Sequence, residues 1–533
     1  MPLGLIPYPR SVQMRRDSLP LDPGSSVSGI GETASAAAQR LVWELADRTG
    51  IPLSVAPPAA EGGAGTTITL RLDDTAGRAP ESYLLEVGPE GATIEAADAA
   101  GLQYATRTLV QLLSPGRPED PAASGWHLPA VRIEDAPRFR YRGLMLDVAR
   151  HFFPVEVVLR VIDRACALGL NHLHLHLSDD QGWRLALASR PELAERASAG
   201  AAQGHRGGFY TRRDWDRIVA HAAARRMTLV PEIDMPGHTH AMGLAYPEIA
   251  AEPVITDEVR AAVTEFGGGI PTPGRPYPGF AVGFSSLRIH EQATYDVLAD
   301  VLSELAGMTP GPYLHIGGDE ALGTPAEDYA VFMARVTGMV AELGKTPIAW
   351  HDAGTVATLA PGTVGQYWGF VRPAPGSADA ARGFPARGGG LILSPADAAY
   401  LDMKVEPGDP LGLDWANGPT STEASYRWEP TEVIPGITES DILGVEAALW
   451  TETIATEADI EAMLFPRLAA VAEIAWSPAS GPERSWESFR SRLAVLAEGW
   501  AATGLRFTRT PGVPWHSPGT GPAVDRDARR LDA

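Results

Sequence analysis

The sequence predicts an α/β protein in which a (β/α)8 TIM barrel follows a small α+β domain. Its 533 residues exceed one ordinary compact domain but suit a barrel with a smaller partner. From Arg138 onward, strand-like and helix-like segments alternate, which is typical of parallel sheets. That region contains eight segments with the composition of buried strands, the number that closes a TIM barrel.

The small domain is predicted over residues 1–137. Residues 34–47 and 101–113 have helical periodicity, and residues 66–72 alternate like a strand. The segments YLLEV and ATIEA flank the turn GPEG and predict a hairpin. No cluster of polar groups indicates chemistry in this region, so we expect a domain whose role is packing.

The barrel is predicted over residues 138–505. Its eight strands are expected at residues 142–148, 171–179, 227–234, 312–320, 346–352, 362–368, 390–400 and 442–452. Crossover helices are expected at residues 154–169, 211–226, 325–344 and 456–473. The chain between the strands at 346 and 362 is too short for a full helix, so we expect an irregular barrel there. Residues 506–533 are rich in Pro, Gly and Arg and predict a C-terminal tail.

Composition excludes several classes of partner. With 44 basic and 66 acidic residues the formal net charge is -22, which disfavours binding to nucleic acid or to anionic membranes. The single cysteine, Cys166, leaves no intrachain disulfide. The first residues lack an apolar signal core, and no apolar run reaches the roughly 18 residues of a membrane span. We expect a soluble protein, cytoplasmic as the sequence stands, with secretion and oligomeric state left open.

Polar and aromatic residues concentrate at the carboxyl ends of the expected strands. Active sites of TIM barrels are built at these ends, so side chains from distant parts of the chain are expected to meet there. The residues concerned are Arg150, Asp179, Asp180, His238, Asp319, Glu320, Trp350, Trp368, Tyr400, Asp402, Trp450 and Glu452.

The pair Asp319 and Glu320 is the sharpest local signal. Adjacent strand residues normally point to opposite faces of a sheet. The preceding Gly317 and Gly318 lack a β-carbon and permit the backbone to leave strand geometry, so both carboxylates can enter one pocket. By itself such a pair also suits a helix N-cap.

Five ordered motifs carry a resemblance to a known family. They read RGLMLDVARHF, HLHLSDDQGWR, PEIDMPGHTHA, LHIGGDEA and ALWTE. The chain resembles the bacterial β-N-acetylhexosaminidases of glycoside hydrolase family 20, and the resemblance extends to the small domain from IPYPRSV onward. It implies a retaining exo-glycosidase without metal or cofactor. Its expected substrate is an oligosaccharide with a terminal non-reducing β-linked N-acetylglucosamine or N-acetylgalactosamine.

The resemblance also implies roles for catalytic residues. Glu320 corresponds to the family's general acid and base, and Asp319 to the residue that holds the acetamido nitrogen. Tyr400 would donate to the acetamido carbonyl. Asp179 and His238 correspond to a support chain behind the acid/base.

The remaining implied roles concern sugar binding. Trp350, Trp368 and Trp450 would wall the N-acetyl pocket, and Trp415 would stack on the sugar beyond the cleaved bond. Three polar residues would bind sugar hydroxyls, namely Arg150, Asp402 and Glu452. The Pro- and Gly-rich segment before VGFSSL, over residues 267–281, has no counterpart that we can place, so one rim loop is without a prediction.

The spacing of the two carboxylates indicates the mechanism. Ordinary retaining glycosidases use carboxylates about 5 to 5.5 Å apart, and sequence neighbours are poorly placed for that. Family 20 enzymes are among the substrate-assisted exceptions, in which the 2-acetamido oxygen is the nucleophile. Asp319 would then accept the acetamido N–H and stabilise the positive charge of the oxazolinium intermediate.

Two other functions remain open at this stage. The alternating His172, His174 and His176 face one side of their strand and suggest a metal-dependent hydrolase, with more candidate ligands in His238, His240 and His315. The late strands supply tryptophans rather than further ligands, which favours hydrogen-bonded core histidines. A carbohydrate-binding pseudoenzyme would keep the aromatic walls without turnover, and the intact acidic pair argues against it.

Overall fold

The computed structural model describes residues 3–57, 68–73, 78–115 and 125–515, and these form two compact units. The first unit contains the described residues up to Arg138 together with Trp476–Thr503 and residues 511–515. The second contains Phe139–Ala475 together with Gly504–Thr510. Residues 66 and 67 of the expected strand and residues 516–533 of the expected tail lie outside the described residues.

The first unit is built on a mixed sheet of eight strands. Its order is β1-β8-β5-β6-β4-β2-β3, with β7 paired to β8. The expected hairpin is the antiparallel pair β5 and β6, whereas β4 runs parallel to β6 and to β2. The strands are β1 Ser11–Leu21, β2 Ser26–Ile30, β3 Ser54–Val55, β4 Ile68–Leu72, β5 Tyr83–Gly88, β6 Gly91–Ala96, β7 Ser114–Pro115 and β8 Trp126–Asp135.

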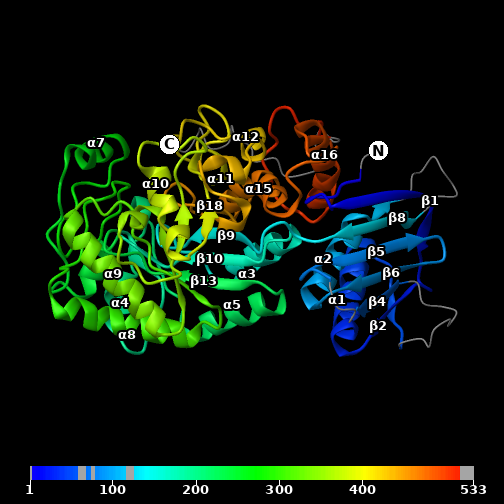
Figure 1. Cartoon of the computed structure of the whole chain (residues 1–533), viewed down its shortest axis with the longest axis horizontal. Coiled ribbons are helices and arrows are strands. Elements are labelled where there is room, and N and C mark those ends of the chain that lie inside the picture. The colour runs from blue at the N-terminus through cyan, green and yellow to red at the C-terminus, as the bar shows by residue number, and fades with distance from the viewer. Residues whose placement is uncertain (1–2, 58–67, 74–77, 116–124, 516–533) are drawn as a thin grey trace. The chain divides into compact units, whose positions relative to one another are not determined.

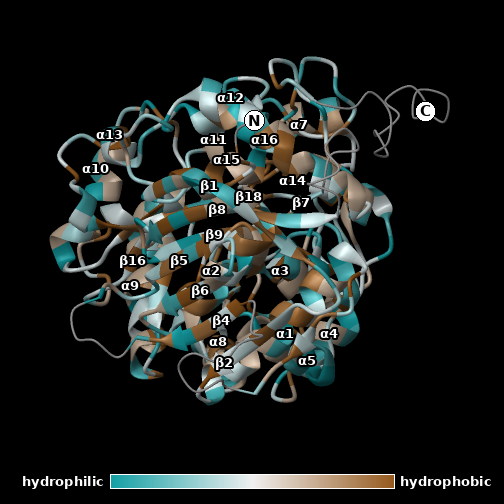
Figure 2. Cartoon of the chain, turned by 90° about the vertical axis from the view of Figure 1, so that its right-hand side faces the viewer, coloured by the Kyte–Doolittle hydropathy of each residue, from teal (hydrophilic) through white to brown (hydrophobic). Residues whose placement is uncertain are grey.

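Two helices cover one face of this sheet. Helices α1 (Glu32–Thr49) and α2 (Ala99–Gln111) lie side by side against its strands (Figure 1). Side chains alternate between buried and half-buried positions along β5, and Figure 2 shows hydrophobic and hydrophilic segments mixed along the strands of this sheet. The buried set packs under the helices, as a one-sided sheet requires. Helix α16 (Trp486–Ala502) belongs to the same unit.

The second unit is a closed parallel barrel with the order β10-β13-β14-β15-β16-β17-β18-β9. Each of the eight segments predicted from the sequence supplies one barrel strand. The prediction of a TIM barrel preceded by a small α+β domain is therefore confirmed. The barrel strands are β9 Tyr141–Asp147, β10 His172–His176, β13 Thr228–Glu232, β14 Tyr313–His315, β15 Thr346–Trp350, β16 Val364–Tyr367, β17 Leu391–Leu393 and β18 Ile442–Leu449.

Helices surround the barrel strands (Figure 1). The helix expected over 456–473 is divided at Pro466, because proline lacks the N–H that a helix interior needs. Strands β15 and β16 are joined by the 3-10 turn His351–Thr355 instead of a helix. The helices are α3 Val155–Ala167, α4 Pro191–Ala197, α5 Arg212–Ala224, α6 His240–Ala245, α7 Asp257–Phe266, α8 Gln292–Met308, α9 Ala326–Glu342, α10 Ser377–Arg382, α11 Ala396–Ala399, α12 Thr422–Tyr426, α13 Pro430–Val433, α14 Glu457–Leu464 and α15 Arg467–Trp476.

The barrel interior is layered along β10, whose alternate side chains point inward. His172 stacks on Tyr141 with ring centroids 3.9 Å apart, and Tyr141 belongs to an apolar cluster. His174, two residues further, lies among buried carboxylates. His176 reaches Asp179, which lies in the short strand β11 (Ser178–Asp179) paired with β12 (Gly182–Trp183). The polarity of the interior thus rises towards the carboxyl ends of the strands.

Among the described residues, no helix is both long and apolar enough to cross a membrane.

Candidate active site

A left-handed turn after β14 brings Asp319 and Glu320 to one cavity. Gly317 and Gly318 have φ values of 66° and 102°, and Glu320 itself has a φ of 46°. A β-carbon at Gly317 would lie 1.6 Å from Oδ1 of Asp234, so only glycine fits there. The amide of Gly318 donates to the same Oδ1 at 3.0 Å and holds the turn in place.

The cavity has a volume of ≈ 420 Å³ and lies at the carboxyl end of the barrel. Most of the residues predicted for the site line it, namely Arg150, Asp319, Glu320, Trp368, Tyr400, Asp402, Trp415, Trp450 and Glu452. The other three, Asp179, His238 and Trp350, are buried behind the lining. The structure therefore brings residues from across the barrel together.

Aromatic rings form a wall on one side of the cavity. The ring centroids of Trp350 and Trp450 are 5.9 Å apart, and those of Tyr400 and Trp450 are 6.1 Å apart. Trp368 meets Trp415 edge to face at 6.1 Å. The indole of Trp368 donates to Oδ2 of Asp352 at 2.8 Å, so its orientation is fixed by a hydrogen bond as well as by packing.

A chain of polar contacts runs behind Glu320. Oδ2 of Asp179 lies 2.8 Å from Nη1 of Arg150 and 2.8 Å from Nε2 of His176. Oδ1 of Asp179 is 3.2 Å from Nδ1 of His238, and Nε2 of His238 is 3.4 Å from a Glu320 oxygen. Asp179 therefore connects Arg150, which lines the cavity, with the imidazole beside Glu320.

The charges of this chain follow from its contacts. Burial opposes ionisation of Asp179, but Arg150 and His238 outweigh it and hold the pKa of that carboxyl far below its usual range. Burial likewise opposes charge on His238, yet Asp179 and Asp319 raise its pKa well above the ordinary value. At neutral pH an imidazolium therefore faces Glu320.

Asp319 and Asp234 form a second part of the site, a pair of neighbouring buried carboxyl groups. Burial raises the pKa of Asp319 well above its usual range, and the neighbouring Asp234 and Glu320 raise it further. Burial also raises the pKa of the neighbouring Asp234 well above its usual range. Burial and mutual repulsion therefore both oppose simultaneous ionisation of these two carboxyl groups.

Three polar atoms of the cavity residues have no hydrogen-bond partner among the described residues. They are Nε of Arg150, Oδ1 of Asp319 and Oδ2 of Asp402. Buried polar atoms are costly to leave unpaired, so their presence indicates a polar ligand. Burial raises the pKa of Glu452 to about 7, against the lowering effect of Arg150. A neutral carboxyl group at Glu452 can both donate and accept a hydrogen bond.

The structure adds residues that the sequence did not identify. The far rim of the cavity is formed by Glu265, Phe266, Phe280, Val282, Leu413 and Asp414. Glu265 and Phe266 belong to α7, and Phe280 belongs to the loop over residues 267–281, which the motifs leave without a prediction. The loop packs on its own small core of Val259, Tyr277, Ala281 and Phe284. The VGFSSL motif after the loop was the one sequence feature that could have indicated these rim residues. It does not indicate how the loop before it folds.

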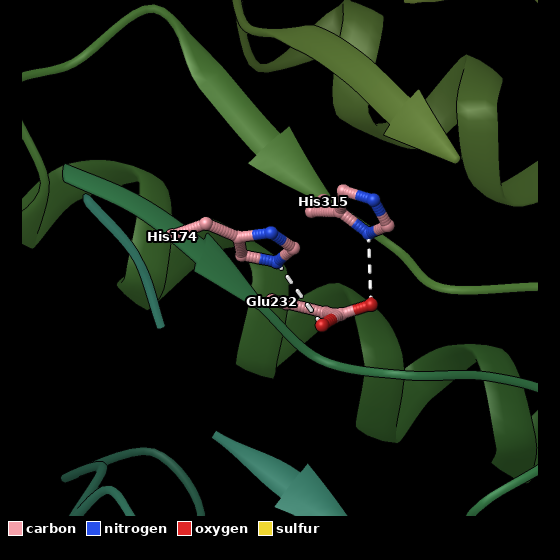
Figure 3. A group of neighbouring side chains, drawn as sticks. All are labelled: His174, Glu232 and His315. Carbon is pink, nitrogen blue, oxygen red and sulfur yellow. Dashed lines mark hydrogen bonds and ion pairs between the residues drawn. The ribbon is translucent and has the colours of Figure 1, made fainter. Parts of the chain in front are cut away.

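Of the alternating histidines, His174 and His176 form hydrogen bonds with the Glu232 carboxylate, whereas His172 contacts the side-chain amide oxygen of Asn171. Figure 3 shows His174 and His315 side by side, each with one nitrogen directed at a different oxygen of Glu232, at 3.0 and 2.9 Å. The three groups lie near enough to bind a metal, but they are fully buried and already directed at one another. The arrangement favours the interpretation as hydrogen-bonded core histidines.

Comparison with known families decides the classification. Residues 139–328 and 322–479 match the catalytic domain of glycosyl hydrolase family 20, and residues 3–136 match domain 2 of the same family. The chain belongs to glycosyl hydrolase family 20. It is a β-N-acetylhexosaminidase, a retaining exo-acting hydrolase, and the function predicted from the motifs is confirmed. Catalysis in this family is substrate-assisted.

Its relatives include enzymes of known structure. The β-N-acetylhexosaminidase of Cellulomonas fimi is 41% identical over 466 residues, which cover 87% of each chain. A solved family 20 β-N-acetylglucosaminidase is 51% identical, with a TM-score of 0.85 over 97% of this chain and 100% of that one. A mutant β-hexosaminidase of Streptomyces plicatus in complex with N-acetylglucosamine is 41% identical, with a TM-score of 0.86 over 96% and 98% of the two chains.

The turn at Gly317 yields a first test. We expect Gly317→Ala to lower kcat by about 100-fold, because the new methyl group displaces Asp234 and misplaces both carboxylates. Gly344→Ala is the matched control, since Gly344 also has a positive φ but no atom lies within 4 Å of the place that its new β-carbon would take. Both variants should lose thermal stability from backbone strain, and Gly317→Ala should lose more because its methyl group also clashes with Asp234. Equal activity of the two variants would contradict the role of the turn.

Proposed function

We propose that this family 20 enzyme releases N-acetylglucosamine from the non-reducing end of β-linked oligosaccharides, with the residue roles given below. The observation that carries the proposal is the shared cavity of Asp319 and Glu320, bounded by Trp368, Tyr400 and Trp450. The N-acetylglucosamine bound to the Streptomyces plicatus relative supports this choice of sugar.

Glu320 is proposed as the general acid that protonates the glycosidic oxygen and then as the base that activates water. Its side chain is 32% exposed and faces the cavity, whereas Asp319 beside it is 10% exposed. The imidazolium of His238, at 3.4 Å, supports the Glu320 carboxylate that forms when the proton leaves. Asp179 fixes the orientation of that imidazole.

The substrate's acetamido group is proposed to supply the nucleophile. Its carbonyl oxygen attacks the anomeric carbon while the leaving oxygen takes the proton of Glu320, and a cyclic oxazolinium forms. Asp319 accepts the acetamido N–H through its unpartnered Oδ1, and the positive charge of the ring favours the ionised form of Asp319. Burial keeps the pKa of Tyr400 well above its usual value, so its phenol remains a donor for the acetamido oxygen.

Polar groups at the closed end of the cavity are proposed to select a terminal sugar. Arg150 and Asp402 each keep one unpartnered polar atom, and Glu452 lies beside them. Asp147 holds Arg150 by accepting from the amides of Ala149 and Arg150 at 2.7 and 3.0 Å. A sugar bound through several hydroxyls at this end leaves no path for further chain, which gives exo cleavage.

The leaving part of the substrate is proposed to bind between Trp415 and the rim of α7. The Trp415 side chain is 47% exposed and Phe266 is 45% exposed, although both line the cavity. Phe266 contacts Phe280 with ring centroids 5.7 Å apart. Sugar rings present apolar faces that pack on aromatic side chains, so this rim suits further units of the leaving oligosaccharide.

Glu320→Gln tests the acid/base role. We expect a loss of about 10²- to 10⁴-fold in kcat/KM for a disaccharide, because the leaving hydroxyl needs a proton. The loss should be much smaller for the p-nitrophenyl glycoside, whose leaving group is stable as an anion. Initial-rate kinetics on both substrates measure the difference, and equal losses would assign Glu320 another role.

Phe266→Ala tests the rim. We expect kcat/KM for a trisaccharide to fall roughly 2- to 10-fold, which corresponds to the loss of about one aromatic contact with the substrate. We expect no change for the p-nitrophenyl sugar. Phe209→Ala is the control, since Phe209 is 38% exposed and does not line the cavity. The rim has no binding role if the two variants have the same ratio of trisaccharide to p-nitrophenyl activity.

A further inference from the structure

One buried carboxylate outside the cavity receives contacts from several parts of the site. Glu232 ends β13, is fully buried and does not line the cavity. Oε1 of Glu232 lies 3.0 Å from the indole nitrogen of Trp350 and 2.9 Å from Nδ1 of His315. Oε2 lies 3.0 Å from Nε2 of His174 and 2.5 Å from Nδ1 of His176. Figure 3 shows two of these four contacts.

Three of the four contacts lead to catalytic groups. Trp350 belongs to the aromatic wall of the cavity. His176 continues through its Nε2 to Asp179, and Asp179 to His238. His315 ends the strand before the glycine turn, and its Nδ1 is 3.0 Å from the amide nitrogen of Gly317. One carboxylate therefore contacts the N-acetyl wall, the support of the acid/base and the strand that carries the acidic pair.

We propose that Glu232 is a positioning residue that couples the N-acetyl pocket to the acid/base. Its carboxylate holds the indole of Trp350 in the wall. Through His176 and Asp179 it also holds His238 beside Glu320. The two requirements of substrate assistance, a confined acetamido group and a correctly placed proton donor, are thereby tied to the same two oxygen atoms.

The protonation of His176 is the part of this arrangement that can be measured. Burial lowers the pKa of His176, but Glu232 and Asp179 outweigh it and raise that pKa to about 10. Only an imidazolium can donate from both nitrogens, here to Glu232 and to Asp179. The other groups that face the ring are the guanidinium of Arg150, 3.2 Å from Nε2, and the indole of Trp450.

The charge of Glu232 itself is maintained by its neighbours. Burial opposes ionisation, but His315, His176 and His174 together hold the pKa of Glu232 well below its usual range. The carboxylate and His176 therefore support each other's charge at neutral pH. A neutral side chain of the same shape at position 232 would leave His176 without its main counter-charge.

The test is the pH dependence of kcat/KM in Glu232→Gln. Wild-type His176 keeps both protons up to its pKa of about 10, so it does not limit activity in the neutral range. In the variant the pKa falls, and above it the fraction of imidazolium drops about tenfold per pH unit. In Glu232→Gln we expect kcat/KM to begin its alkaline fall at a lower pH than in the wild type. In Glu232→Asp, which keeps the carboxylate, we expect the alkaline fall to return to the wild-type pH.

Glu446→Gln is the matched control. Glu446 is also fully buried in the barrel interior, but its partners are Tyr141, His174 and Gln366. We expect it to lose stability like Glu232→Gln while keeping the wild-type pH profile. Superimposable profiles for the two variants would overturn the proposal, since any buried carboxylate would then serve equally.

A second measurement tests the proposal even if Glu232→Gln fails to fold, because it uses the wild-type enzyme. Nitrogen-15 NMR of the histidines in the wild-type enzyme, assigned with His176→Gln, should show His176 doubly protonated at pH 7, and a singly protonated ring would overturn the proposal. The inference rests on the proposed roles of Glu320 and Trp350. Failure of those roles would appear in the leaving-group dependence of Glu320→Gln, whereas failure of this inference would appear only at position 232.

Discussion

The placement of two neighbouring carboxylates in one cavity is the constraint on which the rest of the site depends. A regular strand would send Asp319 and Glu320 to opposite faces. The positive φ angles of Gly317, Gly318 and Glu320 break that alternation just after β14. Catalysis in family 20 is substrate-assisted, so the nucleophile is the substrate's own acetamido group and the two carboxylates serve other steps.

The barrel interior provides the electrostatic support for this pair. Parallel barrels are usually filled by branched apolar side chains, and the layer around Tyr141 follows that rule. The layers above it contain ionised and hydrogen-bonded groups, with His174 and Glu232 at the centre. Such buried charges are tolerated because each has a counter-charge in contact. The site is thus built on an interior that already favours specific protonation states.

Much of the fold and the site could be predicted because both follow local rules. The eight barrel strands are short apolar segments with alternating helices, and their carboxyl ends carry the functional residues. The residues placed at those ends, from Arg150 to Glu452, do meet around one cavity. The two glycines before Asp319 were a usable signal because their role is local and steric.

The remaining features depend on contacts that the sequence does not encode locally. Phe266 lines the cavity only because the loop after α7 folds on its own core around Tyr277 and Phe284. Glu232 alternates inward like any buried strand residue, so its four contacts appear only when β10, β14 and β15 are placed around it. Identifying either residue requires knowing how distant segments of the chain pack against one another.

The central claim is that the substrate's acetamido oxygen is the nucleophile. The most direct measurement is kcat/KM for a series of aryl N-acetylglucosaminides whose acetyl group carries no, one, two or three fluorine atoms. Fluorine withdraws electrons from the carbonyl oxygen and weakens it as a nucleophile. The account expects log(kcat/KM) to fall steeply and regularly with each fluorine. Rates that stay constant across the series would contradict it.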